Sequence, residues 1–272
     1  MDEFVQSNLK LWNEWTDIHE KSASYDLPGF MSGRDSLHPL ELEELGPDVK
    51  PGTTLLHLQC HFGLDTLSWA RRGARVTGVD FSQRAIDLAR RINSELNLGA
   101  EFICSDVYAL PDILQDQFDV VYTSYGVLNW IPDAWKWARV AAHFVKPGGI
   151  FYIAEFHPFF YIFENEGDDL HDLEIKYPYF TQDHPLEFPV SGSYADPSAR
   201  VNHPVEYDWT HNLGEVASAL IAAGLTLHYL HEFPFSVEAS APALMEKGTD
   251  GYWRLKEKQE SVPLMYSIKA GK

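Results

Sequence analysis

The chain has 272 residues, 45% of them apolar, which predicts a globular protein with one substantial core. Its 40 acidic residues against 21 basic residues give a formal charge of −19, which disfavours nucleic-acid binding because phosphate contacts need clustered Lys and Arg. It has no apolar run of about 20 residues, no signal-peptide pattern at its start and only two cysteines, so we expect a cytoplasmic protein that does not bind membranes.

Residues 1–50 predict a helical N-terminal arm. Leu11 and Trp15 fall at helical spacing, a proline–glycine pair then interrupts the chain, and residues 37–45 predict a short second helix. Two roles are open for this arm, namely packing on the core and acting as a lid over a ligand. The main domain is expected to span residues 51–272.

Strands and helices alternate regularly in the next hundred residues. Apolar runs predict the strands, and amphipathic segments bounded by caps such as Ser82 and Gly73 predict the helices. This alternation favours an α/β fold with a parallel sheet and right-handed crossovers. The predicted strands are 54–59, 75–79, 100–104, 118–123 and 150–154, and the predicted helices are 65–72, 83–96 and 133–144.

The alternation stops at residues 156–208, which are rich in aromatic residues and prolines. We interpret this segment as a small β-rich insertion after strand five that covers the substrate, with residues 173–180 as its best strand. The alternation resumes with a helix at 213–223 and with strands at 225–233 and 263–270.

The most informative motif joins the first two strands. An apolar strand enters a loop that ends at Gly63, a helix follows, and the second strand ends at Asp80. A nucleoside-binding βαβ unit has this layout, because loop N–H groups approach the ligand and the acid accepts hydrogen bonds from ribose hydroxyls. The stretch has one glycine where such loops usually have several, and it carries the histidines His57 and His61.

Three further features extend the pattern. Ser105-Asp106 follows the third strand, residues 128–133 follow the fourth, and a Lys-Pro-Gly-Gly turn at 146–149 precedes the fifth. With these features in this order, the chain resembles the class I S-adenosylmethionine-dependent methyltransferases, and within them the UbiE/COQ5-like bacterial group of small-molecule methyltransferases. The resemblance implies a Rossmann-like, doubly wound sheet of seven mostly parallel strands with an antiparallel last strand.

The resemblance also implies S-adenosyl-L-methionine as the cofactor and S-adenosyl-L-homocysteine as its product. His57 stands where the family usually has an acid, and Gln59 and His61 stand where it usually has glycine. Arg34 and Asp65 therefore become candidates, by charge type, for holding the carboxylate and the ammonium of the methionine part. The residues expected to bind the cofactor are His57, Gln59, His61, Gly63, Asp80, Phe81, Ser105, Asp106, Val107, Tyr125 and Arg34.

Methyl transfer requires alignment of nucleophile, methyl group and sulfur, and it needs a base only for a protonated nucleophile. His157, after the fifth strand, is the best candidate base because its reference pKa of about 6.5 suits proton acceptance. Glu155 is either a second candidate or a solvated strand end, and Tyr125 is expected near the sulfonium. No metal site is expected, since the spacing of the histidines and Cys60 matches no zinc pattern. The residues expected to contact substrate are Trp130, Asn129, Tyr194 and Tyr207.

The sequence thus predicts an S-adenosylmethionine-dependent methyltransferase that acts on a small molecule at oxygen, nitrogen or carbon by in-line displacement. Two alternatives stay open. One is a non-catalytic protein that binds S-adenosylmethionine or S-adenosylhomocysteine. The other is a dinucleotide-dependent oxidoreductase, which is weakened because the loop lacks the G-x-G-x-x-G pattern. We expect a monomer or a homodimer.

Overall fold

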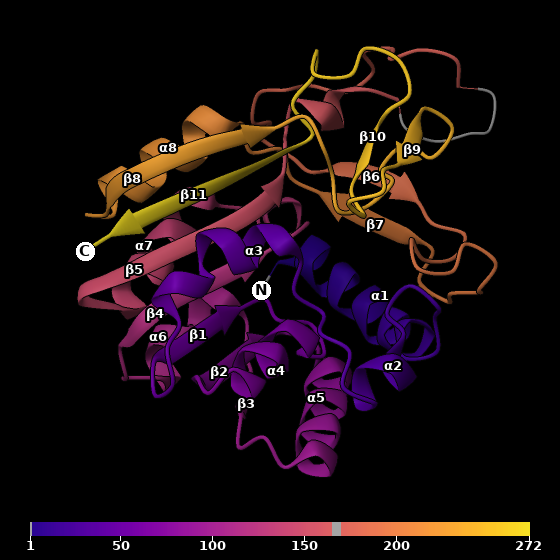
Figure 1. Cartoon of the computed structure of the whole chain (residues 1–272). Coiled ribbons are helices and arrows are strands. Elements are labelled where there is room, and N and C mark those ends of the chain that lie inside the picture. Colours follow the sequence, from indigo (N-terminus) through magenta and orange to yellow (C-terminus); the bar gives the residue numbers. More distant parts are fainter. Residues whose placement is uncertain (1, 165–169) are drawn as a thin grey trace.

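The computed structural model describes residues 2–164 and 170–272. Seven strands within them form the central sheet, and these are β1 (Thr54–Leu58), β2 (Arg75–Asp80), β3 (Glu101–Cys104), β4 (Phe118–Ser124), β5 (Val145–Phe156), β8 (Thr226–Phe233) and β11 (Met265–Gly271). Their order is β3-β2-β1-β4-β5-β11-β8, and β11 runs antiparallel to both β5 and β8 (Figure 1). The predicted Rossmann-like sheet with an antiparallel last strand is confirmed.

Helices cover both faces of this sheet. They are α4 (Leu64–Arg71), α5 (Gln83–Leu96), α6 (Leu110–Ile113), α7 (Ala134–Phe144) and α8 (Leu213–Ala222), with 3-10 turns η1 (Gly46–Asp48), η2 (Val107–Ala109), η3 (Leu128–Trp130) and η4 (Phe160–Ile162). Successive strand residues point to opposite faces. In β1, Leu55 therefore joins the core cluster of Trp69 in α4, whereas Leu56 joins the cluster of Trp137 in α7 and Leu220 in α8.

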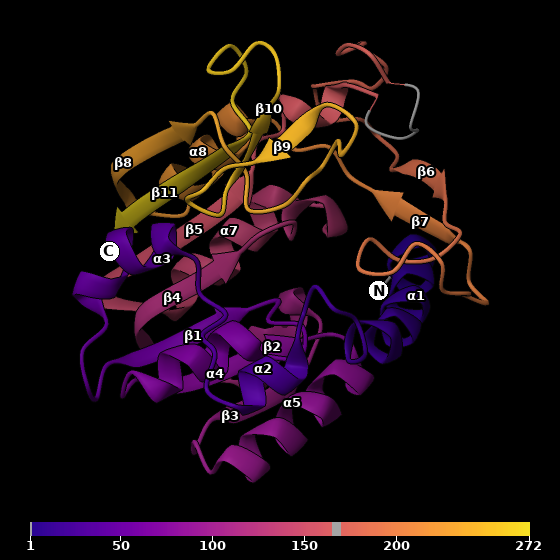
Figure 2. The same ribbon diagram turned by 45° about the vertical axis from the view of Figure 1, so that its right-hand side comes forward.

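The helical N-terminal arm contains α1 (Glu3–His19), α2 (Leu27–Met31) and α3 (Pro39–Glu44). Helix α1 lies beside the antiparallel pair β6 (Leu186–Pro189) and β7 (Val205–Asp208) at the edge of the molecule (Figure 2). The Asn8 side chain donates to the carbonyl of Tyr207 at 2.7 Å and accepts from its N–H at 3.0 Å. These two hydrogen bonds join the arm to the segment that follows the fifth strand.

The expected strand at 173–180 is wrong. In the described part of the insertion, the paired strands are β6 and β7, and the expected segment contributes only an isolated bridge between Ile175 and Phe163. Ile175 and Phe180 are 76% and 70% exposed, so the apolar residues of this segment bury no common face, and Pro178 has no N–H to donate. Residues 165–169 of the predicted insertion lie outside the described residues.

Other boundaries differ only at the ends of elements. Strand β5 begins at Val145, before the glycine turn, and β11 begins at Met265, two residues later than predicted. A short hairpin, β9 (Met245–Lys247) with β10 (Trp253–Leu255), carries no sequence signal that we recognised. Over residues 2–164 and 170–272, no helix combines the length and the apolar character needed to cross a membrane.

Candidate active site

A cavity of about 960 Å³ lies at the carboxyl ends of β1, β2 and β4. Open α/β sheets bind their ligands at this edge, and the volume is typical of small-molecule sites. Its walls come from the loops after these strands, from the arm, and from the segments around Tyr194 and Glu238. The predicted site residues that line it are Arg34, His57, Gln59, His61, Gly63, Asp80, Phe81, Ser105, Asp106, Val107, Tyr125, Asn129, Trp130 and Tyr194.

The loop between β1 and α4 follows a backbone path that favours glycine. Gln59, His61 and Gly63 have φ values of 58°, 50° and 75°, although only one of them is glycine. A left-handed conformation costs a non-glycine residue about 1–2 kcal/mol. The Gln59 side chain offsets part of this cost, because it donates to the carbonyl of Val127 at 2.9 Å and accepts from the Trp137 indole at 3.0 Å. The loop thus keeps its course without the family's usual glycines.

The two histidines of this stretch are neutral. Burial lowers the pKa of His57 to about 3, and its Nδ1 lies 2.8 Å from the Thr66 hydroxyl. Burial, and then the neighbouring His19, hold the pKa of His61 well below its usual range. His61 Nε2 lies 2.9 Å from Nδ1 of His19 in the arm. Neither histidine supplies the negative charge that an acid would provide at these positions.

Asp80 is held at the end of β2 by backbone donors. Its Oδ2 accepts from the N–H of His61 at 2.8 Å, and its Oδ1 accepts from the N–H of Ser82 at 2.9 Å. Burial raises the pKa of Asp80 to about 6, although these N–H groups lower it. At the end of β3, Asp106 Oδ1 accepts from the N–H of Tyr108 at 2.7 Å. The cavity therefore contains two carboxylates in fixed orientations.

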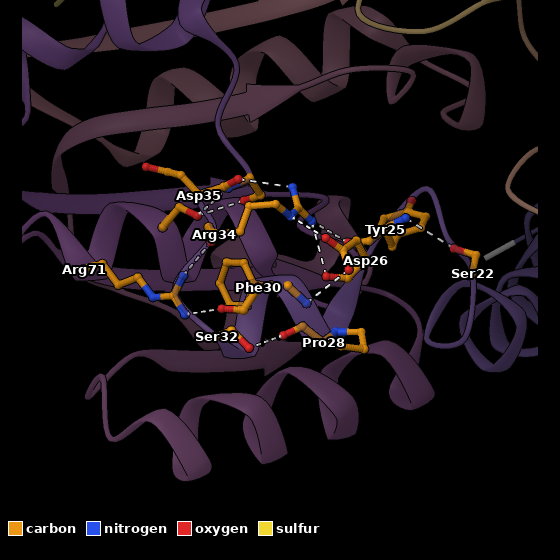
Figure 3. Close-up of polar contacts among 12 residues, drawn as sticks. Ser22, Tyr25, Asp26, Pro28, Phe30, Ser32, Arg34, Asp35 and Arg71 are labelled. Carbon is orange, nitrogen blue, oxygen red and sulfur yellow. Dashed lines mark hydrogen bonds and ion pairs between the residues drawn. The ribbon is translucent and has the colours of Figure 1, made fainter.

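Arg34 contacts mainly other residues of the N-terminal arm (Figure 3). Its Nε pairs with Asp26 at 2.9 Å, its Nη2 donates to the carbonyl of Tyr25 at 2.7 Å, and Arg71 of α4 donates to the carbonyl of Arg34 at 2.8 Å. The role predicted for Arg34, binding the carboxylate of the methionine part, would use the same guanidinium group that makes these contacts. Asp65, in the first turn of α4, also lines the cavity, and burial raises its pKa.

The loop after β4 is organised by Glu155. This buried carboxylate accepts from the N–H groups of Gly126, Val127 and Leu128, the last two at 2.8 and 3.3 Å, and from that of Phe156 at 2.7 Å. Burial raises its pKa, and the four donors lower it. Neither alternative considered from the sequence describes Glu155, since it is not solvated and its oxygens are occupied. It positions the loop that contains Tyr125, Asn129 and Trp130.

Two predicted residues do not line the cavity. His157 is buried, its Nδ1 accepts from the N–H of Phe159 at 3.1 Å, and its Nε2 therefore carries the proton toward Glu232 at 2.9 Å. This placement argues against its expected role as a base, because both ring nitrogens are engaged away from the cavity. Tyr207 packs its ring on Phe4 at 4.9 Å between centroids, and this contact connects the hairpin to the arm outside the cavity wall.

Residues 55–149 match the family model described as a methyltransferase domain. The match runs from β1 into β5 and includes the cavity residues Gly63, Asp80 and Asp106. Over this segment, the chain is similar to the methyltransferase-domain family.

Curated relatives match about half of the length of this chain. The ubiquinone biosynthesis O-methyltransferase of Coxiella burnetii is 30% identical over 122 residues, which cover 44% of this chain and 51% of that protein. The protein of the same name from Alkalilimnicola ehrlichii is 32% identical over 143 residues, 51% of this chain and 58% of the relative. The chain thus spans about half the length of the curated relatives it matches.

A solved structure supports the fold over more of the chain. The crystal structure of an S-adenosylmethionine-dependent methyltransferase from Mesorhizobium loti has a TM-score of 0.58 and 20% identity, and the likeness covers 89% of this chain and 100% of that one. At this identity, the likeness shows the fold.

Several cavity residues were not predicted from the sequence. Trp12, Tyr25, Tyr161, Glu238, Lys247 and Trp253 line the cavity together with the predicted residues. They come from the arm, the insertion and the segment before β11, none of which belongs to the recognised motifs. Only the folded chain brings these side chains to the carboxyl edge of the sheet.

Proposed function

We propose that this protein is a methyltransferase that uses S-adenosylmethionine and acts on a small molecule at oxygen, nitrogen or carbon. The observation that carries the proposal is the cavity at the carboxyl edge of the sheet, where Asp80 ends β2 and Asp106 follows the neighbouring strand β3, beside the Gly63 loop. The match of residues 55–149 to the methyltransferase-domain model supports it.

The cavity residues fit this cofactor chemically. Asp80 is proposed to accept hydrogen bonds from the ribose hydroxyls, beside Phe81, and Asp106 from the adenine amino group, with Ser105 and Val107 beside the ring. Gly63 is proposed to let the backbone approach the methionine part. These roles are supported by the fixed carboxylates and by the left-handed backbone of the loop.

The methionine end requires a different arrangement from the family's usual one. The neutral histidines offer no counter-charge, so we infer that Asp65 faces the ammonium and that Arg34 contributes to the carboxylate. Gln59, His57 and His61 would then shape the site rather than carry charge. Asp65 is supported by its position in the first turn of α4 and by its place in the cavity wall.

S-adenosylmethionine supplies a methyl group activated by the positive sulfur. The residues of this chain would align the acceptor with that group and exclude water. Tyr125 is proposed to lie near the sulfur, and Asn129, Trp130 and Tyr194 to contact the acceptor. The N-terminal arm at 1–50 and the insertion at 156–208 are proposed to close the cavity over the domain at 51–272.

The wider setting of the protein is inferred from charge. A formal charge of −19 supports a protein that does not bind nucleic acid, and we infer a cytoplasmic monomer or homodimer.

Isothermal titration calorimetry tests the proposal directly. S-adenosylmethionine and S-adenosylhomocysteine are expected to bind, and NAD and NADP are not. Asp80→Ala should weaken S-adenosylhomocysteine about tenfold or more, since it removes a charged acceptor. Asp87→Ala, on the exposed surface of α5, is the matched control and should bind normally. Binding of NAD alone, or unchanged affinity in Asp80→Ala, would refute the proposed site.

Turnover is a separate measurement. Incubation with S-adenosylmethionine and a panel of phenols, amines and activated carbon acids should release S-adenosylhomocysteine for at least one class. Cofactor binding without turnover across the panel would favour the non-catalytic alternative.

A further inference from the structure

The carboxylate of Glu238 faces the cavity without a partner. Glu238 lies between β8 and β9 and lines the cavity, and over residues 2–164 and 170–272 its carboxylate makes no hydrogen bond or ion pair. The side chain is exposed, yet burial raises its pKa. Both properties are expected of a carboxylate that opens onto a cavity and is surrounded by protein on its other sides. An unpaired carboxylate in such a space is costly, so it favours a cationic ligand.

Four aromatic residues in the cavity wall, Trp12, Tyr25, Trp130 and Tyr194, form what we call the aromatic cage. The rings of Trp12 and Trp130 are nearly perpendicular at 83°, and their centroids are 5.1 Å apart. The ring centroids of Trp12 and Tyr194 are 6.5 Å apart. The hydroxyls of Tyr25 and Tyr194 are 2.5 Å apart. Several ring faces or edges therefore border one region of the cavity. The faces of tryptophan and tyrosine attract organic cations.

Glu238 and the aromatic cage line the same cavity. Burial is the main reason why the pKa values of Tyr25 and Tyr194 are raised, and the negative charge of Glu238 contributes to both increases. Tyr194 is 51% exposed, and it lines the cavity as Glu238 does. A carboxylate and aromatic rings that line one cavity provide ion pairing and cation–π attraction for a positively charged ligand.

None of the other charged residues in the cavity wall pairs with Glu238, so its carboxylate is available to bind the acceptor. Under the proposed function, Asp65, Asp80 and Asp106 serve the cofactor. The cavity histidines add no positive charge, since burial lowers the pKa of His38 to about 4 and those of His57 and His61 further.

The two cations of the cavity wall do not neutralise Glu238. Arg34 is paired with Asp26. Lys247 is exposed, and its Nζ lies 5.8 Å from the ring centre of Trp253 rather than in an ion pair with Glu238. The acceptor region is therefore negative and aromatic.

We propose that the methyl acceptor is a small molecule with a protonated amine, which Glu238 and the aromatic cage hold. This inference rests on the proposed function and narrows its substrate class. The amine is the anchoring group of the acceptor, and it fixes the orientation of the rest of the molecule against the methyl donor. Neutral alcohols lose the ion pair and the cation–π contact, and carboxylates are repelled.

Matched probes test this selectivity. The protein is saturated with S-adenosylhomocysteine, and binding is measured by calorimetry for three series of equal size: benzylamine, benzyl alcohol and benzoate; 2-phenylethylamine, 2-phenylethanol and phenylacetate; tryptamine, tryptophol and indole-3-acetate. At least one amine should bind about tenfold or more tightly than its alcohol and its carboxylate. The proposal is overturned if no amine binds more tightly than its alcohol, and this includes the absence of measurable amine binding.

Two variants assign the effect to Glu238. Glu238→Gln should lose the amine preference, about tenfold or more, and keep its affinity for the alcohol and for S-adenosylhomocysteine. Glu246→Gln, an exposed acid in β9 outside the cavity wall, is the matched control and should keep the preference. Retention of the amine preference by Glu238→Gln would also overturn the proposal. The affinity of Glu238→Gln for S-adenosylhomocysteine shows that this variant is folded.

Titration with S-adenosylhomocysteine distinguishes a failure of this inference from a failure of the proposed function. If the unmodified protein does not bind S-adenosylhomocysteine, the proposed function itself fails. If it binds S-adenosylhomocysteine but does not prefer amines, only the substrate class is wrong.

Discussion

Replacing Glu155 by glutamine should destabilise the protein more than a change of one atom suggests. Each carboxylate oxygen accepts two N–H groups, those of Gly126 and Phe156 on one side and those of Val127 and Leu128 on the other. A glutamine turns an NH₂ group toward one of these pairs, so two hydrogen bonds to a charged acceptor are lost. At about 1.5–3 kcal/mol each, the loss is about 3–6 kcal/mol.

Relief from burying a charge offsets part of this loss. Burial raises the pKa of Glu155, which shows that the ionised carboxylate is held at a cost. We therefore expect Glu155→Gln to lower the free energy of unfolding by about 2–4 kcal/mol. Affinity for S-adenosylhomocysteine should fall as well, because the loop after β4 forms part of the cavity wall.

Urea unfolding followed by tryptophan fluorescence measures this effect. Glu101→Gln, at the exposed start of β3, is the matched control and should stay within about 0.5 kcal/mol of the unmodified protein. If Glu155→Gln also stays within that margin, the four hydrogen bonds do not hold the loop and the reasoning is refuted.

Three further predictions concern stability and ligand binding. Gly63→Ala places a Cβ 2.5 Å from Phe102 Cε1 at a φ of 75°, so the free energy of unfolding should fall by about 2–4 kcal/mol, and an unchanged urea midpoint would contradict this clash. Burial raises the pKa of Asp80 to about 6, so the carboxylate becomes protonated below that pH and affinity for S-adenosylhomocysteine should weaken by up to about tenfold per pH unit. In calorimetry across about pH 5–8, Asp80→Asn should show an affinity that does not change with pH. His157→Ala should lower the free energy of unfolding by about 2–3 kcal/mol, since the hydrogen bonds to Phe159 and Glu232 are lost, and it should leave S-adenosylhomocysteine affinity unchanged; reduced affinity with normal stability would restore a direct role in the site.

The sheet could be predicted because its local and global signals agree. Strands β1, β2 and β4 are buried on both faces and read as short apolar runs, and α5 begins where Ser82 accepts a hydrogen bond from Ala85 at 3.1 Å. In the insertion, the local sequence pattern and the long-range packing do not indicate the same strands. Strands β6 and β7 are only partly buried, and their position depends on contacts with α1, which is distant in the sequence.

The candidate site likewise contains residues that could be predicted from the sequence and residues that could not. Asp80 and Asp106 were predictable because an acid at the end of a parallel strand must lie at the carboxyl edge. His157 met the same criterion, but the position of a backbone at the edge does not decide where its side chain points, and this one points toward Glu232. Glu238 follows no strand of the motif and reaches the cavity only through the packing of the segment between β8 and β9.

The N-terminal arm and the insertion, which are proposed to close the cavity, lie outside the segment that matches the methyltransferase-domain model. Residues 55–149 contain the strands and loops proposed to hold the cofactor, whereas α1 and the β6–β7 hairpin, joined through Asn8 and Tyr207, lie before and after it. Under the proposed function, substitutions in these flanking regions are expected to alter acceptor binding, with Arg34 as the flanking residue proposed to serve the cofactor. Engineered changes of specificity should therefore include the flanks as well as Asn129 and Trp130.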